Sequence, residues 1–176
     1  AAAAWGVEAR PTLVVLRPDG SMLFRESAGA YPNFRTITAQ VEMRWRDPAL
    51  GHYWISGGVA AGGFDTVGMV DNGRAERGRA TFASSWQGLT YHFASAENRD
   101  AFARAPWRYV PRYGGWCATS IGDGELIEPD PANFLISGDR LLLFSDGMFG
   151  NARDTWQADS RTRSIRAEEA WAERRG

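Results

Sequence analysis

The sequence contains no lysine, because all 20 of its basic residues are arginine. This absence excludes Schiff-base chemistry and a phosphate loop that depends on lysine. Cysteine occurs once, at Cys117, so the chain can form neither an internal disulfide nor a CxxC redox pair. No apolar run approaches the roughly 18 residues needed to cross a bilayer, and the densest run, Leu13 to Leu16, has the length of a strand.

Charge of one sign is not concentrated anywhere along the chain. The 20 basic and 21 acidic residues are interspersed and leave a formal net charge of −1. A stripe that binds polyanions is therefore not indicated, and we expect no nucleic-acid partner. Hydrophobic residues make up 44% of the 176 positions, which is typical of a folded soluble protein with a conventional core.

The first residues do not resemble an intact export signal. Four alanines precede Trp5, without the charged segment and apolar run of a signal peptide. We expect either that a signal peptide has been removed or that the chain is incomplete. Eight tryptophans supply amphipathic anchors for packing or for contacts with a partner.

A boundary near residue 48 divides the chain into two predicted segments, 1–48 and 49–176. In the first, Pro18 and Gly20 occupy turn positions between two short apolar runs, which predicts a β-hairpin over residues 12–25. A helix is predicted from residue 33 up to Pro48, because apolar residues recur there at helical spacing. These residues are Phe34, Ile37, Val41 and Trp45.

Residues 6–20, with Pro11 before the first apolar run and the turn at Pro18 to Gly20, resemble the C-terminal half of a thioredoxin-like domain. The resemblance covers about residues 5–46 and implies a cis peptide bond before Pro11, which is otherwise uncommon. The half that carries the CxxC motif in that family is absent, so no redox function comes with the resemblance. An ordinary hairpin and helix packed on a neighbouring unit fit the same residues.

The second segment begins with a glycine-rich stretch at residues 50–73. Its glycines do not have the spacing of a dinucleotide-binding fingerprint, and they predict turns and close backbone approaches. Further on, Leu89, Tyr91 and Phe93 alternate with more polar residues, which predicts a strand paired with residues 81–86. Ser95 is suited to cap a helix that continues to Arg104.

Residues 91–118 resemble the YHS domain, a small α+β family named after a Tyr-His-Ser signature. The matching signature residues are Tyr91, His92, Phe93, Ser95, Asn98, Tyr113, Gly114, Gly115, Trp116 and Cys117. Flanking segments widen the match to about residues 57–173. They are Gly62–Asp65, a closing hairpin at Asp130–Phe134 and Gly138–Leu141, and closing helices that carry Trp156 and Trp171.

The YHS resemblance implies an α+β fold of small antiparallel strands and helices, and an association with metal handling. Such domains occur in exported bacterial proteins and attached to copper-transporting ATPases and monooxygenases, so we expect a periplasmic protein. This chain departs from the family at Thr66–Met69 and at Leu141–Phe144. Related metal-binding domains use several cysteines, whereas this chain has one, so a single chain cannot form a site closed by thiolates.

Three chemistries are open for Cys117. It could bind copper or zinc with His92, with His52, Met69 or Met148 as further ligands, because thiolate, imidazole and thioether suit soft metals. It could be a redox thiol if it were exposed. It could be a small buried residue within an aromatic wall, which is the commonest situation of a free cysteine.

No motif of a known enzyme class stands out in the sequence. It lacks a GxSxG elbow, an HExxH helix, a P-loop and an EF-hand loop. We therefore expect a non-catalytic accessory subunit that contacts a protein partner in a larger assembly, with peripheral membrane association as one arrangement. A copper- or zinc-binding protein and a single-thiol redox protein are the alternatives.

Overall fold

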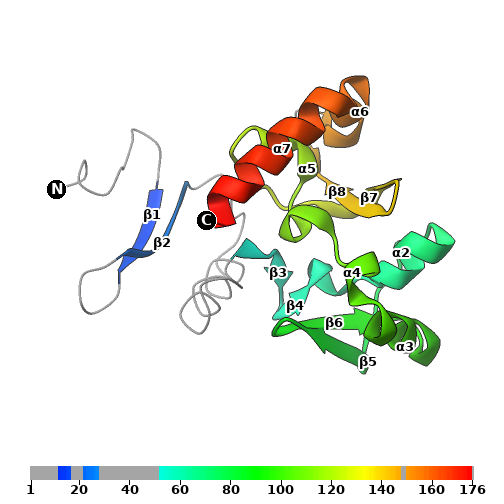
Figure 1. Ribbon diagram of the computed structural model, residues 1–176. Helices are drawn as coiled ribbons and strands as arrows, with labels where there is room; N and C mark the ends of the chain where they lie inside the picture. Colours follow the sequence, from blue (N-terminus) through cyan, green and yellow to red (C-terminus); the bar gives the residue numbers. More distant parts are fainter. Residues whose placement is uncertain (1–11, 17–21, 28–51, 148–149, 176) are drawn as a thin grey trace.

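The computed structural model describes residues 12–16, 22–27, 52–147 and 150–175 (Figure 1). The protein has an α+β fold, as predicted, in which short antiparallel hairpins alternate with helices. Within the described ranges, each sheet consists of two strands, and no helix is long and apolar enough to cross a membrane.

The predicted N-terminal hairpin is confirmed. Strands β1 (Thr12–Leu16) and β2 (Met22–Ser27) pair antiparallel, with a register shift between Val15 and Leu16. Pro11 and the helix predicted from residue 33 lie outside the described residues. The boundary at residue 48 and the thioredoxin-like resemblance therefore stay predictions.

The glycine-rich stretch contains a short hairpin and a helix. Strands β3 (Ile55–Ser56) and β4 (Val59–Ala60) are joined at Gly57 and Gly58, whose φ angles of 61° and 81° favour glycine. A 3₁₀ turn, η3 (Ala61–Gly63), leads into helix α2 (Thr66–Asn72). The turns were predicted and the helix was not.

Asp65 fixes the start of α2 and connects it to the next hairpin. Its buried carboxylate accepts hydrogen bonds from the backbone amide of Gly68 at 3.0 Å, from that of Ala94 at 2.8 Å and from Asn98 Nδ2 at 2.6 Å. One side chain thus joins α2, the end of β6 (Leu89–Phe93) and α3 (Ala96–Arg104). This accounts for the presence of Asp65 and Asn98 among the residues that carry the YHS resemblance.

The central hairpin and helix follow the sequence prediction. Strand β5 (Arg79–Trp86) pairs with β6, and Leu89, Tyr91 and Phe93 are buried as the alternation predicted. Ser95 caps α3 by accepting a hydrogen bond from the Asn98 amide at 3.2 Å. α3 ends at Arg104, and Pro106 then begins a further one-turn helix, α4 (Pro106–Tyr109), which the sequence did not predict.

The last part of the chain forms a second hairpin covered by helices. Strands β7 (Asp130–Ser137) and β8 (Arg140–Phe144) pair as predicted, with a register shift between Asp130 and Phe134. Two short helical elements precede this hairpin, η4 (Arg112–Gly115) and α5 (Ala118–Gly122). The elements that follow it are β9 (Asp146–Gly147), β10 (Gly150–Asn151), α6 (Ala152–Ala158) and α7 (Ser160–Arg175). Trp156 and Trp171 are buried in this part of the core.

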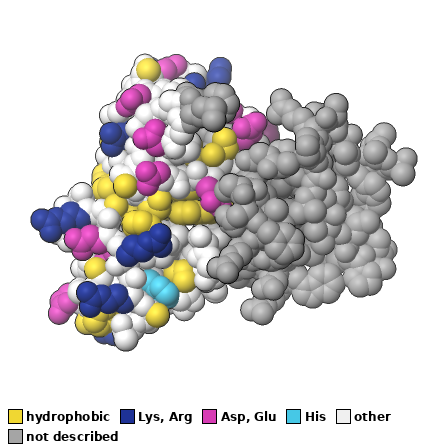
Figure 2. Space-filling model, turned by 180° about the vertical axis from the view of Figure 1, so that it is seen from behind, with side chains coloured by type: hydrophobic (Ala, Val, Ile, Leu, Met, Phe, Trp, Pro, Cys, Tyr) yellow, Lys and Arg dark blue, Asp and Glu magenta, His cyan; other side chains and the backbone are white. Residues whose placement is uncertain are grey.

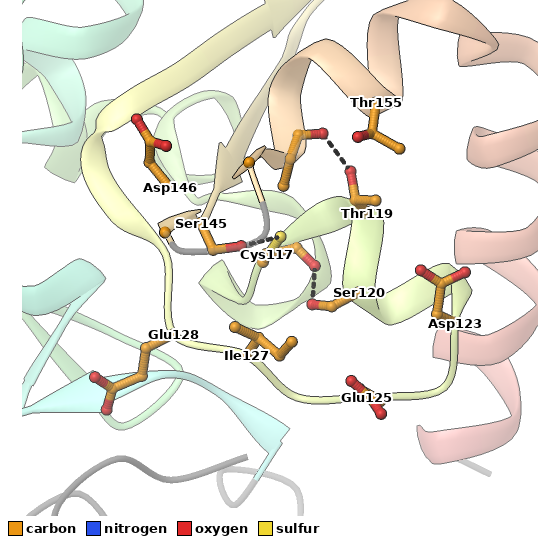
Figure 3. Close-up of a pocket in the computed structure, with 13 residues that line it drawn as sticks. Cys117, Thr119, Ser120, Asp123, Glu125, Ile127, Glu128, Ser145, Asp146 and Thr155 are labelled. Carbon is orange, nitrogen blue, oxygen red and sulfur yellow. Dashed lines mark hydrogen bonds between the residues drawn. The ribbon is translucent and has the colours of Figure 1, made fainter. Parts of the chain in front are cut away.

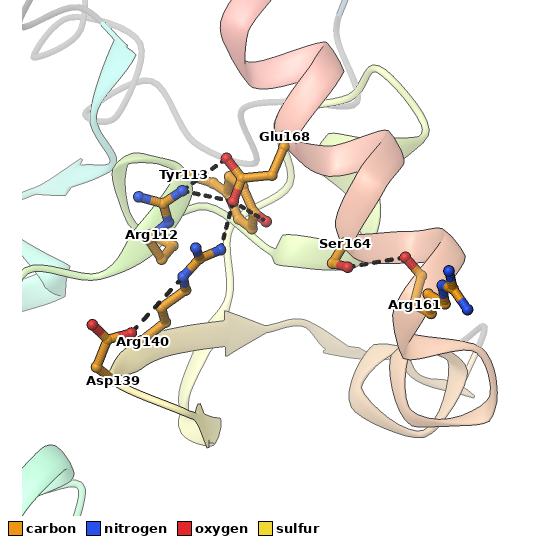
Figure 4. Close-up of polar contacts among 7 residues, drawn as sticks. All are labelled: Arg112, Tyr113, Asp139, Arg140, Arg161, Ser164 and Glu168. Atoms are coloured by element: carbon orange, nitrogen blue, oxygen red, sulfur yellow. Dashed lines mark hydrogen bonds and ion pairs between the residues drawn. The ribbon is translucent and has the colours of Figure 1, made fainter.

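Glu168 attaches α7 to the segments beneath it (Figure 4). Its carboxylate accepts hydrogen bonds from Arg112 at 2.6 and 2.7 Å, from Arg140 at 3.0 Å and from the Tyr113 hydroxyl at 3.2 Å. These donors come from η4 and β8, so one carboxylate holds three elements together. The charged side chains on the face seen in Figure 2 are mixed in sign, and no basic stripe is visible there.

The buried tyrosines predict how stability responds to alkaline pH. Burial raises the pKa of Tyr91 above its ordinary value of 10.0, and Tyr53 acts in the same direction. Burial and then Glu168 also raise the pKa of Tyr113. The folded state therefore holds these protons more tightly than the unfolded chain, and stability is lost as the pH rises above about 10.

We expect Tyr91→Phe to lose less stability than the unmodified protein when the pH is raised above about 10, because the variant has one tyrosine fewer to ionise. Urea unfolding at a series of pH values measures this. Parallel stability curves for the two proteins across the alkaline range would contradict the prediction.

Candidate functional site

Three consecutive residues with positive φ angles lie just before Cys117 in the chain and position it. Tyr113, Gly114 and Gly115 have φ angles of 54°, 62° and 85°. A Cβ at Gly114 would lie 2.5 Å from the His52 carbonyl oxygen and 2.8 Å from the Trp171 ring, so no larger residue fits there without a shift. The turn is thus fixed both by backbone conformation and by close packing.

Cys117 is the residue that caps the N-terminus of α5. Its amide donates to the Ile127 carbonyl at 3.0 Å, and its own carbonyl accepts from Ser120 Oγ at 2.9 Å. The thiol sulfur accepts a hydrogen bond from Ser145 Oγ at 3.4 Å. Only 1% of the residue is exposed, which agrees with the buried cysteine among the three alternatives left open by the sequence.

Cys117 nevertheless borders a cavity of about 430 Å³ (Figure 3). One wall is α5 with Thr119 and Ser120, and another is formed by Ser145, by described residues of the paired strands β9 and β10, and by the start of α6. The loop that includes Ile127 forms the third wall. A volume of this order is in the range of small-molecule sites, about 300 to 1,000 Å³.

The cavity offers mainly hydrogen-bond acceptors to a ligand. The hydroxyl hydrogens of three lining residues are already used: Thr119 donates to the Ala152 carbonyl at 2.8 Å, Ser120 to the Cys117 carbonyl, and Ser145 to the Cys117 sulfur. Only the oxygen lone pairs of these hydroxyls remain for a ligand. The charged residues that line the cavity are all acidic, namely Asp123, Glu125, Glu128 and Asp146.

Of the residues predicted to bind a metal with Cys117, the three that the structure describes, His52, Met69 and His92, do not line this cavity. His92 is on β6, half-buried, and its ring makes no hydrogen bond within the described part of the chain. Met69 is fully buried in α2, and Met148 lies outside the described residues. His52 lies elsewhere. The centroid of its ring is 6.4 Å from that of the Trp171 ring in an edge-to-face arrangement, and its carbonyl accepts a hydrogen bond from Trp116 Nε1 at 3.0 Å.

A search of the described residues finds no group of three or more His, Cys, Asp and Glu side chains that could hold a metal ion. Among the described members of the predicted ligand set, Cys117 is the one that lines the cavity. The redox prediction required an exposed thiol, and the small exposed fraction of Cys117 does not provide one.

Most of the signature residues maintain the fold. Tyr91, Phe93, Tyr113 and Trp116 are buried in the core. The cavity residues other than Cys117 were missed, because Thr119, Ser145 and Asp146 have no motif of their own and come together only through the fold. The feature of the sequence nearest to Ser145 and Asp146 was the predicted closing hairpin, which ends just before them.

Comparisons with known proteins give no further guide to the site. No family model, no curated protein and no solved structure matches this chain.

Proposed function

We propose that this protein is a non-catalytic accessory module that binds a small ligand in the cavity beside Cys117. The observation that carries the proposal is the cavity itself, in which a buried thiol and three oriented hydroxyls meet a space large enough for a small molecule. The resemblance of residues 57–173 to the YHS domain supports an exported protein that serves a larger assembly.

The lining of the cavity favours binding over catalysis. A nucleophilic cysteine requires a neighbouring base, yet neither histidine of the chain lines the cavity. The Ser145 hydroxyl donates to the sulfur, and a neutral hydroxyl is too weak a base to deprotonate a thiol. The walls therefore hold a ligand in place without a visible acid–base pair to transform it.

One exposed aromatic residue supports contact with a protein partner. Trp107 on α4 is 72% exposed, and its neighbours Pro106 and Tyr109 are buried, which fixes the direction of this short helix. Exposed tryptophans are enriched among the residues that dominate protein interfaces. Partner binding is thus the second part of the proposed accessory role.

Filling the cavity tests the binding proposal. Thr155 lines the cavity from the exposed side of α6, and we expect Thr155→Trp to weaken binding at least tenfold because the indole would occupy the ligand's space. A set of small amines, amino acids and sugars is first screened by thermal shift, and hits are measured by calorimetry. Thr162→Trp, at an exposed position on α7 away from the cavity, is the matched control.

Equal binding by the two tryptophan variants, or no binding by the unmodified protein, would refute the proposal. Copper or zinc bound in proportion to the chain, and lost in Cys117→Ser, would instead favour the metal-binding alternative, with Cys117 as its ligand.

A further inference from the structure

We propose that the ligand of the Cys117 cavity is a small aliphatic diamine or polyamine, an inference that rests on the proposed function. The hydroxyl and carboxylate side chains that line the cavity present acceptors, whereas an ammonium group carries only donors. The two sets are complementary, and the same complementarity disfavours anions and ligands rich in acceptors.

The oriented hydroxyls are the first support for this class of ligand. Thr119 and Ser120 are more than nine-tenths buried, and both hydroxyl hydrogens point to backbone carbonyls at 2.8 and 2.9 Å. Ser145 directs its hydrogen to the Cys117 sulfur. A ligand that reaches these oxygens must therefore bring its own N–H or O–H donors.

The sign of the charge around the cavity selects N–H donors that carry positive charge. The four charged lining residues are acidic, and Asp146 forms no ion pair within the described residues. Asp123 lies 3.5 Å from Arg163, so part of its charge is already compensated. A cleft lined by charges of one sign concentrates the opposite sign, which favours a cation over a neutral polyol.

The spread of the carboxylates selects an extended cation over a metal ion. Asp146, Asp123 and Glu128 belong to different walls of the cavity, and Figure 3 shows them well separated. No three of the described His, Cys, Asp and Glu side chains converge as a metal would require. Two ammonium groups joined by methylenes can reach separate walls, and Ile127 and Ala152 provide apolar surface for the methylenes between them.

Calorimetry on the full chain tests the assignment with 1,4-diaminobutane as the probe and 1,4-butanediol and Mg²⁺ as comparisons. We expect the diamine to bind more tightly than either comparison, and more weakly as salt is raised. Asp146→Asn should weaken diamine binding about threefold to tenfold through the loss of one charged contact. Asp139→Asn, which removes the same charge from a residue 94% exposed in the β7–β8 turn, should change it less than twofold.

The polyamine assignment fails if the diol or Mg²⁺ binds as tightly as the diamine, or if the two asparagine variants weaken diamine binding equally. Its failure is distinguishable from that of the proposed function. A ligand of another class whose binding is lost in Thr155→Trp overturns the assignment and leaves the proposed function standing, whereas a cavity that binds nothing in the screen overturns both.

Discussion

Replacing Asp65 with alanine is expected to lower the free energy of unfolding by about 3 to 5 kcal/mol. The carboxylate is fully buried and accepts from two backbone amides and from Asn98. Hydrogen bonds to a charged group contribute about 1.5 to 3 kcal/mol each, and the buried amides would lose their acceptor without gaining water. Because these donors lie on three elements, the loss would affect α2, β6 and α3 together.

Urea unfolding of Asp65→Ala beside Asp100→Ala measures the effect. Asp100 is exposed on α3 and pairs only with its neighbour Arg99 in the described part of the chain, so its variant should stay within about 0.5 kcal/mol of the unmodified protein. A loss below about 1 kcal/mol for Asp65→Ala would show that the carboxylate is not what joins these elements.

A second large effect is expected at Gly114. Gly114→Ala should cost about 3 kcal/mol or more, because its Cβ would lie within 3.1 Å of the His52 carbonyl, the Trp171 ring and the Tyr53 Cα. The φ of 62° adds the usual cost of a left-handed alanine, about 1 kcal/mol. The Cβ would meet backbone atoms of His52 and Tyr53 on one side and the buried Trp171 ring on the other. Moving either of these would cost further free energy, because both are packed in the fold.

Gly124→Ala separates the two causes. Gly124 has a φ of 81° and nothing within 4 Å of the position of a Cβ, so it reports the backbone cost alone. We expect about 1 kcal/mol there by thermal or urea unfolding. If Gly114→Ala were no more destabilising than Gly124→Ala, close packing would not be what fixes the turn before Cys117.

Local patterns in the sequence predicted the elements that local physics determines. The alternation at Leu89, Tyr91 and Phe93 gave β6, and Ser95 gave the start of α3. Helix α2 was missed because its start depends on Asp65, whose carboxylate is held in place by partners 29 and 33 residues away. Long-range contacts of this kind leave no periodic signal in the chain.

The candidate site shows the same division. Cys117 could be singled out because it is the one cysteine of the chain. The cavity could not be predicted, since Thr119 on α5 and Ser145 after β8 are 26 residues apart in the sequence and line one cavity only through the fold. The ligand set drawn from His92 and Met69 assumed that scarce residue types meet, whereas the fold places Met69 in the core and His92 on β6.

The three left-handed residues before Cys117 have a consequence for how such a protein can diversify. Backbone torsion at Tyr113, Gly114 and Gly115 positions the Cys117 backbone, and Ser145 donates a hydrogen bond to the sulfur from another wall of the cavity. Exposed wall residues such as Asp146 and Thr155 are therefore free to vary without displacing the thiol. A single scaffold can in this way keep the sulfur in the same position while changes in the wall residues adapt the cavity to ligands of different shape and charge.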